Sequence, residues 1–157
     1  MPTPAELADQ LLDGAAALRQ AVAGMTREQL TARPVAGKWS TLEVVCHLAD
    51  FDPVLVERMK RIIALPDVPL LLVADENDFQ KALAYHDRDA ENELAIIDAT
   101  RRQAAQIIRT LKPEQLQLTG CHNKKGIVTL EKVIQTAINH IPHHLKFVAE
   151  KRKALAI

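Results

Sequence analysis

Apolar residues recur at helical spacing along four long segments of the chain. Two of these segments open on a capping box, Thr3-Pro4-Ala5-Glu6 and Ser40-Thr41-Leu42-Glu43. In this motif the side chain of the first residue accepts a hydrogen bond from the backbone N–H of the fourth, and the side chain of the fourth accepts one from the backbone N–H of the first. Glycine or proline follows where most of the patterns stop. We therefore predict four long helices, over residues 3–24, 40 to about 64, roughly 89–111, and 129 to about 154.

The connections between these segments carry little pattern of their own. Residues 65–86 mix apolar and polar positions without a clear period, and they could hold a short helix over one end of a bundle. Leu70-Leu71-Leu72-Val73 is one short apolar run without a partner strand in view, so strand evidence is thin. We expect an all-α protein, with residues 1–157 forming a single domain and an up-and-down four-helix bundle as the first choice of architecture.

Composition fits this fold and narrows the function. Apolar residues make up 48% of the 157 residues and aromatic residues only 3%, so the core must consist of Leu, Ile, Val and Ala. Twenty basic side chains balance twenty acidic ones without a basic block, which argues against nucleic acid as a partner. The apolar runs are too short to span a membrane, and no export signal is visible. We expect a cytoplasmic protein with Cys46 and Cys121 reduced.

The fourth segment contains the clearest chemical feature, three histidines within five positions. His140 and His144 are one helical turn apart on the side that carries the apolar stripe, whereas His143 falls among polar residues and points outward. Histidines four positions apart on one face can direct both imidazoles at one metal ion. The alternative is that both are core or interfacial histidines with ordinary hydrogen bonds. Pro142 between them removes one helical hydrogen bond and should bend the helix.

A metal site needs a third ligand, and His47 in the second segment is the candidate. It lies two turns inside a capped helix but well off the centre of that helix's apolar stripe. Asp50, three positions later, could orient the His47 imidazole or act as a base. It could equally pair with Arg58 or face solvent, and we favour this structural role.

Residues 37–50, with the sequence Gly-Lys-Trp-Ser-Thr-Leu-Glu-Val-Val-Cys-His-Leu-Ala-Asp, together with Glu57-Arg58, resemble the second-helix signature of the DinB-like, or YfiT-like, metalloenzyme superfamily. Residues 129–148 resemble its fourth-helix signature. Members of this family are four-helix bundles that bind a divalent metal, commonly zinc or nickel. The resemblance implies His47, His140 and His144 as the ligands. Phe147 stands where many members have a glutamine.

Three neutral imidazoles leave one coordination position open for water or substrate. A zinc-bound water can have its pKa lowered to about 7, and the same position could instead hold a thiol as its thiolate. The resemblance implies both chemistries, because relatives are described as hydrolases and as transferases that use low-molecular-weight bacterial thiols. The substrate would then be a small molecule.

Other candidate residues have structural explanations. Glu43 belongs to a capping box, and Cys46 lies about 100° around the helix from His47, which favours a buried, inert thiol. Cys121 and His122 fall in a loop before the fourth segment, and His86 falls in a connection where exposure is expected.

Three classes of function remain open from the sequence. The leading one is a metal-dependent hydrolase or thiol transferase. The second is a noncatalytic metal-binding or stress-response protein, for which a closed site with four protein ligands would be typical. The third is a helical interaction module without metal. In each case an apolar bundle with few aromatic residues favours a homodimer.

Overall fold

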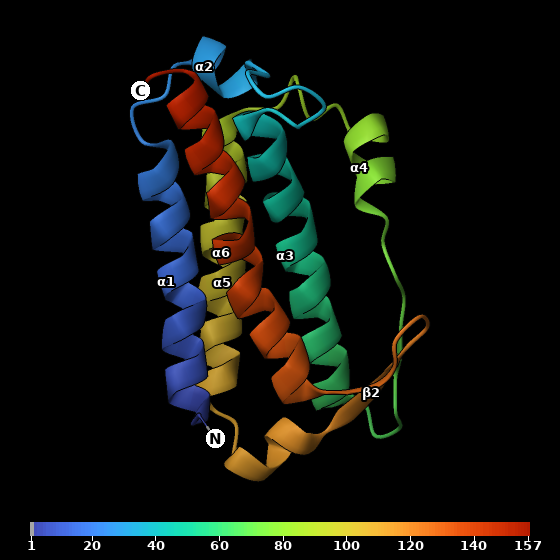
Figure 1. The fold of residues 1–157 in the computed structure, drawn as a ribbon. Helices are drawn as coiled ribbons and strands as arrows, with labels where there is room; N and C mark the ends of the chain where they lie inside the picture. Colours follow the sequence, from blue (N-terminus) through green and yellow to red (C-terminus); the bar gives the residue numbers. More distant parts are fainter. Residues whose placement is uncertain (1) are drawn as a thin grey trace.

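A computed structural model describes residues 2–157 and shows four long helices packed as a bundle (Figure 1). Shorter elements occupy the connections between them. The long helices are α1 (Pro4–Val22), α3 (Thr41–Ala64), α5 (Ala90–Arg109) and α6 (Leu130–Ala154). The short elements are α2 (Arg27–Thr31), α4 (Glu76–Ala82), the 3-10 helix η1 (Pro113–Gln117) and the strands β1 (Leu70–Leu71), β2 (Thr119–His122) and β3 (Gly126–Thr129).

Side-chain caps set the starts of the long helices, as the sequence predicts. The Thr3 and Ser40 side chains accept hydrogen bonds from the backbone N–H three residues on, and both predicted capping boxes are present. Asp89 and Thr129 cap α5 and α6 in the same way. All four long helices therefore begin within one residue of the predicted position.

The four-helix bundle is confirmed, but its connectivity is not a simple alternation. α1 packs against α5 and α6, and α3 packs against the same two helices, so α1 and α3 lie on a diagonal. Residues 65–89 run back along the bundle before α5 begins, which makes α5 parallel to α3 (Figure 1). As a result, α3 and α6 are antiparallel neighbours, and the middle of α6 faces the first half of α3.

The connection after α3 carries a strand pairing that was not expected. Leu70 and Leu71 pair in parallel with Cys121 and His122, and β2 pairs with β3 as an antiparallel hairpin. The expectation that this apolar run has no partner was therefore wrong, because a two-residue strand leaves no periodicity to detect. Gly120 permits the close approach, since a Cβ there would lie 2.8 Å from a Leu71 methyl carbon.

α4 is the short helix expected in this connection, and it lies beside the first half of α3 rather than across the end of the bundle (Figure 1). The Phe79 ring packs against Phe51 with 5.2 Å between centroids. Gln80 donates a hydrogen bond to the buried Glu43 carboxylate. These contacts attach α4 to α3 near His47.

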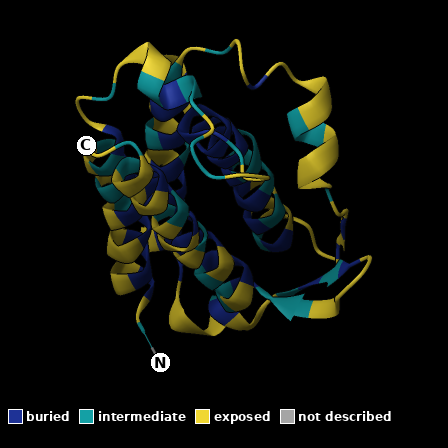
Figure 2. Ribbon diagram, turned by 45° about the horizontal axis from the view of Figure 1, so that its top comes forward, coloured by how far each residue is buried: buried dark blue, intermediate teal, exposed yellow. Residues whose placement is uncertain are grey.

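The bundle interior consists of two apolar clusters, one toward each end, with buried faces turned inward and exposed faces turned to solvent (Figure 2). A fully buried ion pair between Asp52 and Arg101 lies between them. Arg101 also donates to the carbonyl oxygens of Leu11 and Ala137, so it connects all four long helices. Gly14 leaves room for it, since a Cβ at residue 14 would lie 2.6 Å from an Arg101 nitrogen.

None of the helices described in residues 2–157 combines the length and the apolar character that a membrane crossing requires.

Candidate metal centre

His47, His140 and His144 come together where α3 faces α6. Their ring centroids are 4.6 to 4.9 Å apart, and one ring nitrogen from each lies within 4.8 Å of the others. The Nε2 atoms of His47 and His140 are 3.0 Å apart. The structure thus groups the three residues that the sequence and the family resemblance single out.

The helices explain how this cluster forms. His140 and His144 lie one turn apart on α6, so both face the same neighbouring helix. His47 lies off the main apolar stripe of α3, but its face is covered by α6 and by the aromatic rings of Trp39 and Phe51, whose centroids lie 5.4 and 4.6 Å from the His47 ring. His47 is only 1% exposed as a result.

Burial keeps two of these imidazoles uncharged. Burial, followed by the charges of the neighbouring histidines, lowers the pKa of His47 to about 3. The same causes lower the pKa of His144 to about 4. Both rings are therefore neutral at neutral pH, which is the protonation state in which imidazole binds a metal ion.

The donor set also fits a divalent ion by its geometry. In a tetrahedral zinc site with metal–nitrogen bonds of about 2.0 to 2.1 Å, ligand nitrogens lie roughly 3.3 Å apart, which the spacing of this cluster allows. The Nδ1 atoms of His47 and His140 are buried without a hydrogen-bond partner in the described part of the chain. Core histidines normally have hydrogen-bond partners for their ring nitrogens. Two Nε2 atoms that face each other at 3.0 Å, on rings whose Nδ1 atoms have no partner among the described residues, are instead expected for ligands of one metal ion.

Asp52, which the sequence did not single out, lies behind His140. Its Oδ1 is 3.9 Å from the His140 Nδ1, and the Arg101 guanidinium binds both of its oxygens. Burial raises the pKa of Asp52, but the facing His140 ring and Arg101 outweigh this effect and hold the pKa below its ordinary value. A charged carboxylate behind a metal-binding imidazole orients the ring and increases its basicity.

Glu76 is a second residue that the sequence did not indicate. It comes from the first turn of α4, and its Oε2 lies 3.7 Å from the His47 Nε2. Its side chain is 52% exposed and borders a pocket of about 420 Å³ that His140 and His144 also line. The capped start of a short helix, Asp75-Glu76, was the available signal, but no periodicity in residues 65–86 places it beside α3.

The structure places Asp50 in a different environment from the histidines. Both of its oxygens accept hydrogen bonds from Arg88, at 2.9 Å each, and Arg88 also pairs with Glu93. The expected structural ion pair therefore forms, with Arg88 rather than Arg58 as the partner. A catalytic role for Asp50 stays a prediction.

The remaining cysteines and histidines lie outside the cluster. Cys46 is fully buried, its thiol donates to the Tyr85 carbonyl, and burial raises its pKa to about 12. Cys121 and His122 belong to β2 rather than to a loop. His86 is exposed, as expected. His143 is also exposed, although it borders the same pocket as His144.

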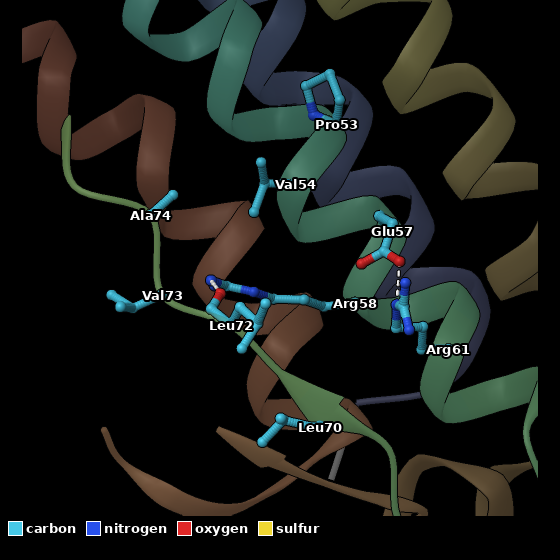
Figure 3. A pocket seen from close by; sticks show the side chains of 9 residues that line it. All are labelled: Pro53, Val54, Glu57, Arg58, Arg61, Leu70, Leu72, Val73 and Ala74. Carbon is cyan, nitrogen blue, oxygen red and sulfur yellow. Dashed lines mark hydrogen bonds and ion pairs between the residues drawn. The ribbon is translucent and has the colours of Figure 1, made fainter. Parts of the chain in front are cut away.

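A larger hollow of about 690 Å³ lies farther along α3, between this helix and residues 70–74 (Figure 3). Arg58 extends across it and donates to the Leu72 carbonyl, while Glu57 and Arg61 pair with each other (Figure 3). The lining includes no histidine or cysteine. The histidine cluster therefore borders the smaller pocket and not this one.

Comparisons with known proteins agree with this arrangement. A protein of Oceanobacillus iheyensis named "Putative metal-dependent hydrolase" is 28% identical over 138 residues, which cover 87% of this chain and 79% of that protein. YfiT of Bacillus subtilis, with the same descriptive name, is 29% identical over 136 residues, covering 86% and 76%. YuaE of Bacillus subtilis, an uncharacterised protein, is 30% identical over 143 residues, covering 84% and 88%.

The solved structure of YfiT matches with a TM-score of 0.89 and 26% identity, over 98% of this chain and 87% of that one. It is described as "a probable metal-dependent hydrolase with an unusual four-helix bundle topology". The sequence model of the DinB superfamily matches residues 10–148, which is most of the chain. With its fold, its three grouped histidines and this match, the protein belongs to the DinB superfamily.

Proposed function

We propose that the protein is a metal-dependent hydrolase of small molecules, with a divalent ion held by His47, His140 and His144. The observation that carries the proposal is the cluster of three ring nitrogens within 4.8 Å of one another, beside a pocket large enough for a small substrate. Three protein ligands are typical of catalytic zinc sites, whereas structural sites are normally closed by four. When bound, such an ion supplies Lewis acidity for water activation or carbonyl polarisation.

The protein's own groups provide the remaining functions. The charge of Asp52, 3.9 Å from the His140 Nδ1, favours a proton on that nitrogen and so leaves the Nε2 atom free to bind a metal. Trp39 and Phe51 keep bulk water from His47. We assign to the Glu76 carboxylate the role of accepting the proton of the attacking water. It is the carboxylate whose oxygen lies 3.7 Å from the His47 Nε2, and it borders the pocket.

The test is a hydrolysis screen of metal-loaded protein with nitrophenyl esters, nitroanilides and nitrophenyl phosphates. We expect metal-dependent turnover of at least one class, lost in His144→Ala. Glu76→Gln should slow turnover by roughly 10²- to 10⁴-fold while leaving metal content unchanged. Asp78→Asn, which changes another carboxylate of the same short helix, is the matched control. If fully loaded wild type hydrolyses no member of the panel, the hydrolase proposal is wrong.

Thiol transfer, the other reaction that the family resemblance implies, stays a prediction, as does the choice between zinc and nickel. Adding cysteine and 1-chloro-2,4-dinitrobenzene to the same protein separates the reactions. Hydrolysis proceeds without thiol, whereas transfer consumes one thiol for each product formed. Elemental analysis of the purified protein identifies the metal.

A further inference from the structure

Lys151 is a buried cation near the metal centre that has no carboxylate partner. It lies near the end of α6, is only 2% exposed, and borders the same pocket as His140 and His144. No carboxylate oxygen lies within 4 Å of its ammonium group in residues 2–157. Buried charges in proteins are normally paired, so an ammonium without a counter-ion at a pocket wall needs an explanation.

One protein hydrogen bond satisfies part of the Lys151 ammonium group. The Lys151 Nζ donates to the Phe147 carbonyl oxygen at 3.0 Å, one turn earlier in the helix. A lysine near a helix C-terminus commonly satisfies a free carbonyl in this way. An ammonium has three N–H donors, however, and this contact uses only one of them.

The surroundings of Lys151 include a second lysine, and the nearby acids are either exposed or already bound to other groups. Lys38, from the loop before α3, and Lys151 each lie 5.9 Å from the centre of the Phe147 ring, and Lys38 borders the same pocket. Among the nearby acids, Glu43 already binds Arg33, Gln80 and the Ser40 N–H, and Glu150 is exposed. Burial lowers the pKa of Lys151, and Lys38 lowers it further, while Glu150 and Glu43 offset only part of this effect, so the pKa stays below its ordinary value.

This cationic wall is close to the metal ligands. Both lysines line the pocket that His140 and His144 also line. Trp39 and Phe147 supply aromatic surface to the same pocket. A bound molecule could therefore contact the metal ligands and the two ammonium groups at once.

We propose that Lys151 and Lys38 form a subsite for a carboxylate group of the substrate. As a substrate subsite, this assignment rests on the proposed hydrolase function. It adds the substrate class: small molecules that carry an anionic carboxylate beside the bond to be cleaved. Each ammonium group lies 5.9 Å from the centre of the Phe147 ring, within the range of a cation–π contact.

Binding to the metal-free protein tests this subsite without any catalytic assay. Trp39 is the single tryptophan of the chain and borders the pocket, so quenching of its fluorescence reports occupancy. The probes are 4-nitrobenzoate and 4-nitrobenzamide, which share size and ring but differ in charge. Measurements at about pH 8 keep ordinary imidazoles neutral and ordinary lysines charged. We expect the carboxylate to bind about tenfold more tightly than the amide.

Charge variants assign the preference to the two lysines. Lys151→Met keeps most of the side-chain volume and should abolish the preference for the carboxylate, whereas Lys151→Arg should retain it. Lys146→Met, an exposed lysine of the same helix, is the matched control and should bind as wild type does. Lys38→Met changes an exposed residue and should weaken carboxylate binding severalfold even if Lys151→Met fails to fold.

Equal binding of the two probes to wild type, or no binding of either, overturns the subsite. A preference that persists in folded Lys151→Met and in Lys38→Met overturns it as well. The result is separate from the fate of the hydrolase proposal, since a carboxylate preference that depends on Lys151 would stand even if the metal-loaded protein hydrolysed nothing.

Discussion

His47 and His144 are uncharged at neutral pH because the fold buries them against each other and against His140. The spacing of His140 and His144 within α6, together with the family resemblance that implied His47, made this cluster of three histidines predictable from the sequence. Asp52, Glu76 and Lys151 were not predictable in this way. Asp52 and Glu76 each lie near a histidine of a different helix. Lys151 lies near Lys38 of the loop before α3, because both contact the Phe147 ring. Helical periodicity describes one helix at a time and cannot show such contacts.

The low pKa values of these histidines predict how stability depends on pH. In the unfolded chain a histidine gains a proton below about pH 6.5, but His47 and His144 stay neutral in the metal-free folded protein until about pH 3 and 4. The unfolded state therefore binds more protons in this window. The free energy of unfolding should fall by a few kcal/mol as the pH drops from about 6.5 to 4.

Urea unfolding of metal-free protein across that range measures this effect. His47→Gln removes one of the titrating groups and should flatten the dependence. His86→Gln, at an exposed position, should leave it as in wild type. An unchanged slope in His47→Gln would show that His47 is not held neutral by the fold.

Asp52→Asn should weaken metal binding about 10- to 100-fold, because the carboxylate that orients His140 loses its charge. Competition with a chelator measures the affinity. Asp50→Asn is the matched control, since Asp50 also lies on α3 and also pairs with a guanidinium, but that of Arg88. Equal affinities of the two variants would exclude a positioning role for Asp52.

At the scale of elements, the long helices were predictable because their caps are local. Thr3, Ser40 and Thr129 each bond the backbone N–H three residues on, and such contacts depend on neighbouring residues only. The small sheet was not predictable, since its parallel pair joins residues about fifty positions apart. The position of α4 also depends on distant contacts, above all Phe79 with Phe51.

Phe79→Ala removes the ring contact with Phe51 that attaches α4 to α3. We expect α4 to become more mobile, so that the Glu76 carboxylate is held less firmly beside His47. We expect faster amide hydrogen exchange in residues 76–82 with unchanged exchange in the four long helices, and slower hydrolysis at unchanged metal content. Leu83→Ala, an exposed position just after the same helix, is the comparison. Exchange that stays at the wild-type rate in Phe79→Ala would mean that other contacts hold α4.

For the whole molecule, the order of the helices brings the site together. The long connection returns along the bundle, so α3 and α6 become antiparallel neighbours and His47 meets His140 and His144. A four-helix bundle was predictable from lengths and caps, but this pairing was not, because sequence patterns do not say which helices are neighbours. The homodimer stays a prediction that sedimentation velocity can test, as do the cytoplasmic location and the absence of nucleic-acid partners.

The most direct test of the account is the metal content of the protein purified without an affinity tag. Wild type should contain close to one divalent ion per chain. His47→Ala, His140→Ala and His144→Ala should lose it, and the exposed His143→Ala should retain it. Folded wild type that stays empty after metal is supplied, or folded variants of the three ligands that keep a full equivalent, would contradict the account.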